Sequence, residues 1–347
     1  MDPMNNPLVT INLVVWNGEK YIRHCLDAIR AQTYENVEVN ILDNASRDRT
    51  KKIIKNEYPE FNLVENDRNI GLGMGMEKLL KQTNGEYKVF LCVDVLMNPD
   101  FVEKAIETME KNPKIGALQG KVMSYRIEHD NVIHTEYIDT CGFKIFKDRR
   151  IVNIGHGEKD EGQYDREGEV WGFEGAVPVF RVAALKDATM NKDGEVWDHD
   201  YFWYVDDVDL AWRLRLLGWF SYYNPKVIAH HDRQTSKSIA RGAKGYFSLE
   251  RQKVRWSIPL VKRRLDWKNL KFTLIKNDNN GNWLSLIKRE ILTTGYTVLF
   301  EPKVLLGTFD LIKKLPKMLR KRREIQNRAV ISREEMTKWF DKDVYII

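Results

Sequence analysis

The sequence is poor in cysteine and contains no long apolar run. Its 347 residues include three cysteines, Cys25, Cys92 and Cys141, whose spacing matches no zinc or redox motif. Unpaired thiols of this kind are typical of a reducing compartment. No apolar stretch approaches the ~18 residues that a bilayer span needs. Residues 1–7 also lack the basic start and apolar segment of a secretory signal. We therefore expect a cytoplasmic protein without a membrane-spanning helix.

Internal repeats and low-complexity tracts are also absent, which argues against a fibrous or disordered chain. With 43% hydrophobic and 31% charged residues, the composition is that of a globular protein. A length of 347 residues allows one large domain with an appendage, or two domains.

Positive charge is concentrated near the C-terminal end. Residues 301–347 hold 12 Lys and Arg against 7 Asp and Glu, which accounts for most of the net charge of +6. A basic patch attracts anionic partners, so three possibilities are open: a membrane surface, nucleic acid or no partner at all. No recognised nucleic-acid module accompanies it, so we expect no nucleic-acid partner. Residues 283–315 mix apolar runs with Lys and Arg, which fits a membrane-interface segment or a helical subdomain packed on the core equally well.

The N-terminal third alternates between strand and helix patterns. Strand patterns cover residues 8–15, 37–42, 61–65 and 87–93, and helix patterns cover 19–31, 48–56, 72–82 and 99–111. Repeated strand–helix units predict an α/β fold with a Rossmann-like, mostly parallel sheet flanked by helices. Ligands on such sheets bind beyond the carboxyl ends of the strands.

Two local patterns in this third concern helix starts. Asn44 and Ser46 are expected to cap the helix over 48–56. Gly71, Gly73 and Gly75 lie at the next helix, but the spacing of a dinucleotide-binding motif fails because Met76 takes the third glycine position. We expect no nicotinamide cofactor, and we expect the glycines to let the backbone approach another strand or a ligand closely.

Polar side chains follow the strands at the expected ligand edge. Trp16 and Asn17 follow the first strand, and Asp43 ends the second, where its carboxylate can accept the imide N–H of a uracil or thymine ring. Arg68 and Asn69 follow the third strand and can hold a diphosphate or a base. Each of these residues also fits an ordinary turn or helix cap.

A divalent-metal site is predicted at the same edge. Asp94 follows the fourth strand, and His230 and His231 end a closing strand predicted over 219–231 and interrupted at Pro225. Carboxylate and imidazole are suitable ligands for Mg²⁺ or Mn²⁺. Each residue alone is more often structural, but together they favour Asp94 as one ligand and either histidine as another.

An acidic cluster is the most informative motif. Asp206, Asp207 and Asp209 crowd into four positions between apolar residues. Like charges and partial burial both raise a carboxyl pKa toward that of a useful general base. The alternative is a solvated helix start, where acids favour the positive end of the helix dipole.

The second half of the chain is less regular. Residues 124–170 are rich in His, Asp, Gly and charge and predict inserted loops and short strands. We divide the chain into a domain at 1–240 and a helical, basic C-terminal region at 241–347. The domain is expected to hold a nucleotide-binding half at 1–123 and an acceptor half at 124–240.

The ordered series of motifs resembles the family 2 glycosyltransferases of the GT-A fold over residues 8–236. The segments that carry the resemblance are Val15-Trp16-Asn17-Gly18, Leu42-Asp43-Asn44-Ala45-Ser46, Asn66-Asp67-Arg68-Asn69-Ile70-Gly71, Asp94 before Asn98-Pro99-Asp100, Asp206-Asp207-Val208-Asp209-Leu210 leading to Arg213 and Gly218-Trp219, and Asn224-Pro225 leading to His231 and Ser236. Residues 138–142, 157–158, 162–165, 169–172, 321–326 and 331–332 are similar to the bacterial rhamnosyltransferase branch.

The resemblance implies an inverting glycosyltransferase. It would move a sugar, best matched by L-rhamnose from dTDP-rhamnose, from a nucleotide-diphosphate sugar to a hydroxyl of a cell-envelope glycan or lipid-linked acceptor. Such enzymes work at the cytoplasmic face of the membrane, so the C-terminal region would associate peripherally with that surface.

The resemblance also implies roles for single residues. Asp207 would be the catalytic base, and Asp206 and Asp209 would raise its pKa. The donor would be held by Trp16, Asn17, Asp43, Arg68, Asn69 and Asp94. The divalent metal, Mg²⁺ or Mn²⁺, would be held by Asp94 with His231 or His230. Trp171, Trp197 and Trp203 are candidates for stacking on sugar rings, although tryptophan is more often a core residue.

Two departures from the family pattern define the alternatives. Cys92 takes the first place of the Asp-x-Asp metal motif, and the Glu-Asp base motif reads Asp206-Asp207. A lapsed enzyme without metal would be a non-catalytic nucleotide-sugar or glycan-binding scaffold. A nucleotidyltransferase would need a phosphate-binding glycine loop after the first strand, where only Gly18-Glu19-Lys20 stands.

Overall fold

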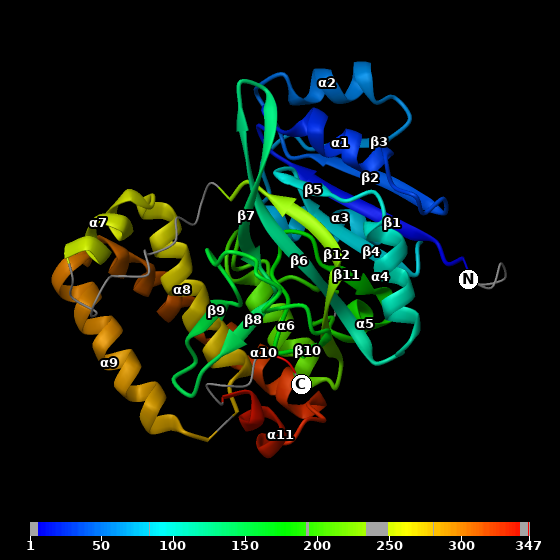
Figure 1. Cartoon of the computed structure of the whole chain (residues 1–347). Helices are drawn as coiled ribbons and strands as arrows, with labels where there is room; N and C mark the ends of the chain where they lie inside the picture. Colours follow the sequence, from blue (N-terminus) through cyan, green and yellow to red (C-terminus); the bar gives the residue numbers. More distant parts are fainter. Residues whose placement is uncertain are drawn as a thin grey trace.

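The computed structural model describes residues 6–82, 84–191, 194–233, 249–279, 281–340 and 346 (Figure 1). The strands are β1 Val9–Val15, β2 Val37–Asp43, β3 Asn62–Glu65, β4 Tyr87–Cys92, β5 Val95–Met97, β6 Ile115–Glu128, β7 Asn131–Thr140, β8 Phe143–Ile145, β9 Ile151–Asn153, β10 Gly168–Val170, β11 Val179–Arg181 and β12 Phe220–His231. The helices are α1 Ile22–Arg30, α2 Thr50–Glu57, α3 Leu72–Gln82, α4 Phe101–Glu110, α5 Val182–Asp187, α6 Asp206–Leu216, α7 Leu249–Ser257, α8 Leu260–Asn277, α9 Trp283–Phe300, α10 Gly307–Arg328 and α11 Arg333–Thr337, with short 3-10 helices at Pro302–Leu306 and Lys338–Phe340.

A ten-stranded mixed sheet forms the centre of the molecule. Its order is β10-β12-β6-β11-β4-β1-β2-β3, with β5 beside β12 and β7 beside β6. The pairs β4-β1, β1-β2 and β2-β3 are parallel, as the repeated strand–helix units predict. In the second half β11 runs antiparallel to both β4 and β6. The predicted α/β class with a helix-flanked sheet is therefore confirmed, and the parallel arrangement holds for its N-terminal half.

Helices cover both faces because successive residues of a buried strand point to opposite sides. Ile11 and Leu13 of β1 pack with apolar residues of α1, α2 and α4, whereas Val14 packs with residues of α3, α5 and α6. Such strands carry apolar side chains on both faces, which is why β1 reads as an almost continuous apolar run.

The elements of the N-terminal third lie close to their predicted ranges, but the predicted capping of α2 is wrong. Neither Asn44 nor Ser46 caps this helix, which begins at Thr50. Asp48 accepts a hydrogen bond from the Thr50 N–H (3.1 Å) instead. The Asn44 amide binds the 69–71 turn, and Ser46 Oγ accepts from the Asn17 N–H (2.9 Å), so both residues join turns at the ligand edge.

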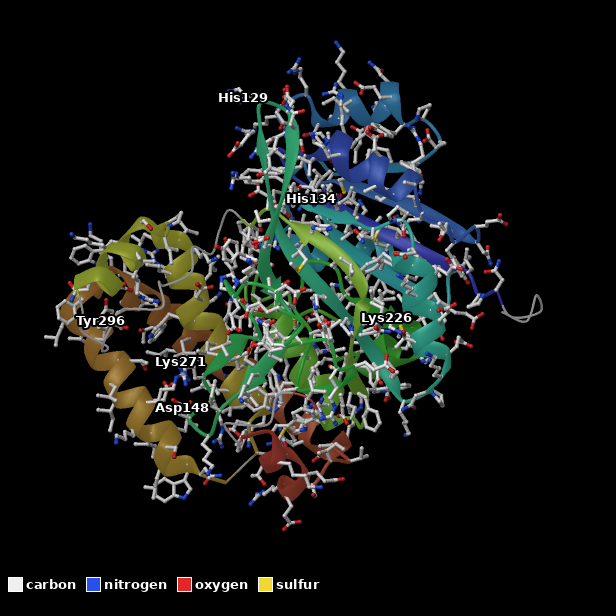
Figure 2. All side chains as sticks on the ribbon, in the orientation of Figure 1. His129, His134, Asp148, Lys226, Lys271 and Tyr296 are labelled. Carbon is white, nitrogen blue, oxygen red and sulfur yellow. The ribbon has the colours of Figure 1, made fainter. Side chains whose placement is uncertain are left out.

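Residues 124–170 are more ordered than the sequence predicts. β6 and β7 form a long antiparallel hairpin that projects beyond the sheet, with His129 at its tip (Figures 1 and 2). The short strands β8, β9 and β10 follow. Strand β12 has a register shift between Asn224 and Ile228, which is where the sequence predicts an interruption at Pro225.

Gly71 is required where α3 approaches the segment that precedes α6. Its φ of +88° lies in the region that glycine adopts most easily, and a Cβ there would lie 2.3 Å from the carbonyl oxygen of Phe202. A Cβ on Gly75 would press on Val14 and Leu42 at 3.0 Å. The predicted close approach to another strand is therefore confirmed for Gly75, which lies against side chains of β1 and β2, whereas Gly71 approaches a segment that is not a strand.

The C-terminal helices pack on the sheet domain through α6. Trp212 and Leu216 of α6 lie in one apolar cluster with Leu274 of α8, Ile325 of α10 and Trp339. The predicted boundary at residue 240, like Ser236, lies outside the described residues. Within the described ranges, no helix is both long and apolar enough to cross a bilayer.

Part of the basic C-terminal charge is neutralised inside the molecule. Lys321 of α10 contacts Glu195 and Asp198 (both 2.7 Å), and Lys317 contacts Asp200 (2.7 Å). These contacts hold α10 on the sheet domain, but they lie outside residues 283–315, for which the two arrangements were predicted. In that segment Leu286 and Leu311 pack on core clusters, while many other apolar side chains are exposed, so both predicted arrangements stay open.

Candidate active site

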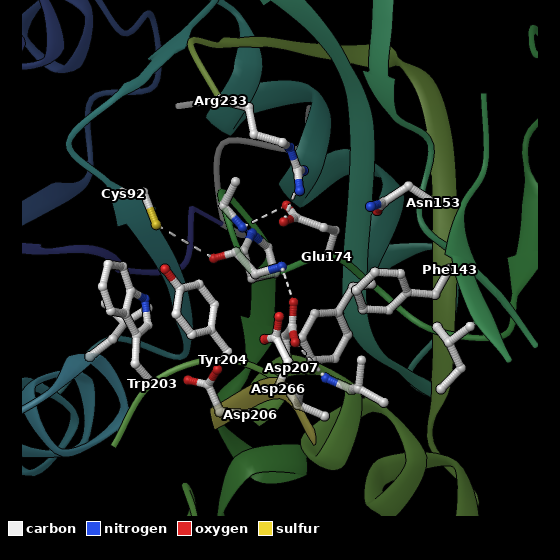
Figure 3. Close-up of a pocket in the computed structure, with 18 of the residues that line it drawn as sticks. Cys92, Phe143, Asn153, Glu174, Trp203, Tyr204, Asp206, Asp207, Arg233 and Asp266 are labelled. Atoms are coloured by element: carbon white, nitrogen blue, oxygen red, sulfur yellow. Dashed lines mark hydrogen bonds and ion pairs between the residues drawn. The ribbon is translucent and has the colours of Figure 1, made fainter. Parts of the chain in front are cut away.

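A pocket of about 580 Å³ opens at the carboxyl end of β4 (Figure 3). Its walls come from the 173–176 segment, the start of α6, the β8–β9 hairpin, α8 and α9. The carboxylates that line it are Asp94, Glu174, Asp206, Asp207 and Asp266. The pocket lies at the edge of the sheet where ligands are expected in folds of this class.

Asp207 lies near the middle of the pocket, in the first turn of α6 (Figure 3). Its Oδ2 accepts a hydrogen bond from the Gly175 N–H (3.1 Å) and its Oδ1 from the Val208 N–H (2.8 Å). Burial raises the pKa of Asp207 to about 8, and the nearby charges of Asp206 and Glu174 add to the rise. A carboxyl group with this pKa can take a proton from a bound hydroxyl near neutral pH.

The other two acids of the cluster have different roles. Asp206 lines the same pocket, and burial raises its pKa to about 6. Asp209 is 1% exposed, and its carboxylate accepts from Lys276 (2.9 Å) and Asn277 (2.7 Å) of α8. Of the two acids predicted to raise the pKa of Asp207, Asp206 therefore acts directly, whereas Asp209 belongs to a buried ion pair and acts on Asp206.

The backbone that leads into Asp206 is strained and is held by α8. Phe202, Tyr204 and Val205 have φ values of 66–67°, a region that costs a residue with a side chain about 1–3 kcal/mol. The fully buried Asn269 donates its side-chain N–H groups to the carbonyls of Trp203 and Tyr204 (both 2.8 Å). Asn269 is thus a positioning residue for the start of α6.

His231 lies between two carboxylates at the sheet edge. Its Nδ1 is 2.9 Å from Asp139 Oδ2, and its Nε2 is 3.4 Å from Asp94 Oδ2. Burial alone would lower the pKa of His231, but Asp139 and Asp94 outweigh it and raise that pKa to about 10. Glu174 lies close enough to join Asp139 and His231 in a set of possible metal ligands. The Arg233 side chain forms ion pairs with Asp139 and Glu174.

This donor set fits a divalent cation. With a pKa of about 10, His231 is protonated near neutral pH, so a cation bound at Nε2 would have to displace the proton that faces Asp94. The remaining N–H at Nδ1 would still be donated to Asp139, which is the usual arrangement behind a histidine ligand. Asp94 and Glu174 add the carboxylate oxygens that Mg²⁺ and Mn²⁺ prefer.

Cys92 also lines the pocket, but burial raises the pKa of its thiol well above the usual value. All three cysteines are unpaired, as predicted.

His230 is not brought to this site. It lies on the opposite face of β12, and its Nδ1 is 3.1 Å from Nδ1 of His134 on β7 (Figure 2 labels His134). Burial and the charge of His134 lower the pKa of His230 to about 4. Of the two histidines left open by the sequence, the geometry therefore favours His231 as the partner of Asp94.

Five of the six predicted donor-binding residues gather at the ends of β1, β2 and β3 and are not among the described residues that line the pocket: Trp16, Asn17, Asp43, Arg68 and Asn69. The sixth, Asp94, follows β4 and lines the pocket. Asp43 is fully buried; its Oδ2 accepts from the Ser46 N–H (3.1 Å), and its Oδ1 has no hydrogen-bond partner. Asn17 accepts from the Arg47 N–H (2.8 Å), and Trp16 beside it is 51% exposed. A carboxylate oxygen without a hydrogen-bond partner, together with an exposed aromatic ring, is suited to bind a nucleotide base.

The turn after β3 brings Asn69 against the turn after β2. Its Oδ1 accepts from the Asn44 side chain (3.0 Å) and from the Gly71 N–H (2.8 Å), so Asn69 holds the turn together. Arg68 beside it is exposed to solvent.

The three candidate tryptophans have three different environments. Trp203 is 38% exposed, lines the pocket and stacks on Tyr204 at 4.4 Å. Trp197 also lines the pocket but is mostly buried against Phe90. Trp171 is a core residue in edge contact with Trp212, so its predicted stacking on a sugar ring is wrong.

Several site residues could not be identified as such from the sequence. Asp139, Glu174, Arg233 and Asn269 come from four segments far apart in the chain. Asp139 lies within a segment that resembles the rhamnosyltransferase branch, which was the one available signal. The others reach the site through tertiary contacts that have no local pattern.

Comparisons with known sequences agree with this geometry. Residues 10–173 match the model of the family described as Glycosyl transferase family 2. The putative glycosyltransferase EpsH of Bacillus subtilis is 33% identical over 108 residues, which are 30% of this chain and 31% of EpsH. The poly-beta-1,6-N-acetyl-D-glucosamine synthase of Staphylococcus epidermidis is 25% identical over 227 residues, 63% of this chain and 48% of the synthase. The chain thus spans between about a third and a half of these relatives' length.

Solved structures share the fold at low sequence identity. GalNAc-T7, crystallised with UDP, GalNAc and Mn²⁺, matches 79% of this chain and 48% of its own with a TM-score of 0.56 and 11% identity. The mannosyltransferase PcManGT of Pyrobaculum calidifontis, in complex with GDP-Man and Mn²⁺, matches 99% of this chain and 90% of its own with a TM-score of 0.50 and 17% identity. The fold is therefore the GT-A fold, and residues 10–173 are similar to glycosyl transferase family 2.

Proposed function

We propose that this chain is an inverting glycosyltransferase that moves a sugar from a nucleotide-diphosphate donor to an acceptor hydroxyl. The observation that carries the proposal is Asp207, a carboxyl group with a pKa of about 8 near the middle of a 580 Å³ pocket. The family match and the nucleotides bound in the similar solved structures support a nucleotide-sugar donor.

The proposed chemistry is a single displacement. Asp207 takes the proton of the acceptor hydroxyl while the acceptor oxygen forms a bond to the anomeric carbon of the donor sugar. The bond from that carbon to the diphosphate breaks on the opposite face, and the nucleoside diphosphate leaves with the electron pair. A metal ion held by Asp94 and His231 would offset the charge that develops on the diphosphate.

The donor is proposed to lie with its base against Asp43 and Trp16. The buried Oδ1 of Asp43 would accept the imide N–H of uracil or thymine, while Asn17, Arg68 and Asn69 support the nucleotide. The motif likeness to rhamnosyltransferases makes dTDP-L-rhamnose the first donor to try, with a cell-envelope glycan or lipid-linked sugar as acceptor.

Metal-dependent donor turnover tests this function. We expect one donor among dTDP-rhamnose, UDP-sugars and GDP-sugars to be hydrolysed slowly with Mn²⁺ or Mg²⁺ and not with EDTA. Replacing Asp139 by Asn should weaken metal affinity by roughly 10–100-fold, because Asp139 orients His231. Asp130→Asn, which removes a carboxylate at the tip of the β6–β7 hairpin, is the matched control. Absence of binding to every donor would favour the non-catalytic scaffold suggested by Cys92.

We also propose peripheral association with an anionic membrane surface through α9 and α10. Large apolar side chains are exposed along both helices and their connection: Trp283, Leu284, Ile287, Ile291, Leu292, Val298, Leu299, Leu306, Phe309, Ile312, Leu315 and Leu319. Over residues 283–328 the exposed cations are Lys288, Lys303, Lys313, Arg320 and Arg323, and the exposed acid is Asp310. An apolar surface with an excess of positive charge fits the interface of an anionic bilayer.

Vesicle sedimentation tests this surface. Wild-type protein is expected to bind phosphatidylglycerol vesicles and to bind phosphatidylcholine vesicles weakly. The double variant Ile291→Glu, Phe309→Glu should bind at least about tenfold more weakly, because each apolar side chain contributes about 1.5–3 kcal/mol when buried. Tyr137→Glu, an exposed apolar site on β7, serves as the control. Equal sedimentation of all three proteins would contradict the proposal.

A further inference from the structure

The pocket has a cationic side that the proposed chemistry does not use. Arg150 from the β8–β9 hairpin, Lys262 from α8 and Arg289 from α9 all line it. Here we call these three residues the cationic wall. The proposed metal site is formed by Asp94, which follows Cys92 at the end of β4, and by His231 at the end of β12. The cationic wall is therefore built from other elements than the proposed metal site.

Contacts among neighbours fix the cationic wall in place. Asp148 joins two of its members: its carboxylate accepts from the Arg150 backbone N–H (3.0 Å), and its carbonyl lies 3.5 Å from Arg289 Nη1. Lys262 is 9% exposed, and its ammonium group lies over the Tyr204 ring at 4.3 Å. Lys262 therefore contacts the side chain of Tyr204, a residue of the strained segment that leads into Asp206 and Asp207.

The wall has more positive than negative charge. Glu290, the acid next to Arg289, forms a close ion pair with Lys271 and lies 3.5 Å from Arg289. Asp266 lines the pocket on the same helix as Lys262, and burial raises its pKa to about 6. Three cations thus line this side against one acid, and two of them are arginines, whose planar groups bind phosphate oxygens in pairs.

We propose that the cationic wall binds a phosphate group carried by the acceptor. This inference rests on the proposed transferase function, because it assumes that the acceptor hydroxyl lies at Asp207. Lys262 lines the same pocket as Asp207 and interacts with its charge, so an acceptor with its hydroxyl at Asp207 would bring a nearby phosphate group against the wall. The phosphate can belong to a lipid carrier or to a soluble phosphorylated glycan.

The position of Arg289 favours the lipid carrier. Arg289 lines the pocket from α9, while its neighbours Ile287 and Ile291 on the same helix are exposed. A single helix therefore forms both a wall of the pocket and part of the apolar surface. An amphiphile with its phosphate at Arg289 would have apolar protein surface within reach of its chain.

Binding of short diphosphates tests the cationic wall. The whole protein is titrated by calorimetry with farnesyl diphosphate, inorganic pyrophosphate and farnesol, in EDTA so that no metal recruits phosphate at Asp94. We expect both diphosphates to bind and farnesol to bind at least tenfold more weakly than farnesyl diphosphate. Arg150→Gln and Arg289→Gln should each weaken diphosphate binding about tenfold, since each removes charged hydrogen bonds. Arg333→Gln, an exposed arginine on α11, should bind as the wild type does.

The two sources of phosphate give different results. Tighter binding of farnesyl diphosphate than of pyrophosphate supports a lipid carrier, and equal binding supports a soluble phosphorylated glycan. Unchanged binding by both pocket variants, or equal binding of farnesol and farnesyl diphosphate, overturns the inference. Metal-dependent donor turnover by a protein that binds no diphosphate would overturn the inference alone, whereas diphosphate binding without any donor turnover would overturn the transferase function on which it rests.

Discussion

Replacing Asp207 by Asn is expected to lower the rate of sugar transfer by about 10²–10⁴-fold, the usual contribution of a general base. The amide cannot take up the acceptor proton, although its oxygen can still accept from the Gly175 N–H. Donor affinity, measured by calorimetry with the nucleotide-sugar, should change little because the proposed base and phosphate contacts lie elsewhere. A variant that keeps most of its turnover would remove Asp207 as the base.

The pH profile provides an independent readout of the same residue. Asp207 must be deprotonated to act, and burial with like charge places its pKa at about 8, so transfer should rise with pH through that value. Asp206→Asn removes one neighbouring negative charge and should move this rise to lower pH. The other charged groups around Asp207 are Glu174, Arg233 and Lys262, which stay unchanged in the variant. A profile that is identical in both proteins would contradict the assignment.

Replacing Lys276 by Met is expected to lower the free energy of unfolding by about 3–5 kcal/mol, the usual cost of leaving a buried ion without its partner. Lys276 is fully buried on α8 and contacts Asp198 (2.5 Å) and Asp209 (2.9 Å), which are also buried. Burial would raise the pKa of Asp198, but Lys276 and Lys321 outweigh it and hold that pKa well below its usual range.

Urea denaturation followed by circular dichroism measures this loss. Lys317→Met is the matched control, because the Lys317 side chain is 37% exposed and pairs with a different acid, Asp200 (2.7 Å), two residues from Asp198. The exposed pair should contribute at most about 1 kcal/mol. Similar losses in both variants would contradict the importance that we assign to burial.

The N-terminal half of the fold could be predicted because its signals are local. The buried strand β1 and the helix α3 are visible as an apolar run and an amphipathic repeat within single segments. The long β6–β7 hairpin was missed because β7 mixes exposed, half-buried and buried residues without a regular alternation, so its sequence does not mark it as a strand.

The site was predictable mainly where a motif stands at the end of a strand. Asp94 and His231 were found in this way, and the structure brings them together. Asp207 was found instead from the crowding of three acids at the start of a helix. Alternation along β12 implies that His230 and His231 face opposite sides, but the sequence does not say which side holds Asp94. Asn269 could not be found, because a polar residue within a helix pattern is normally expected on its solvated face.

Helix α8 has a consequence for how this protein can change in evolution. Lys276 binds the acidic residues beneath α6, Asn269 holds the backbone before Asp206, and Lys262 lines the pocket. A gene fusion that joined the sheet domain to other C-terminal helices would therefore inherit the carboxylates that we propose to be catalytic without the residues that orient them. The two parts should be exchanged between proteins only as one unit, and a shift in acceptor preference is expected to arise from substitutions within α8 and α9 rather than from their replacement.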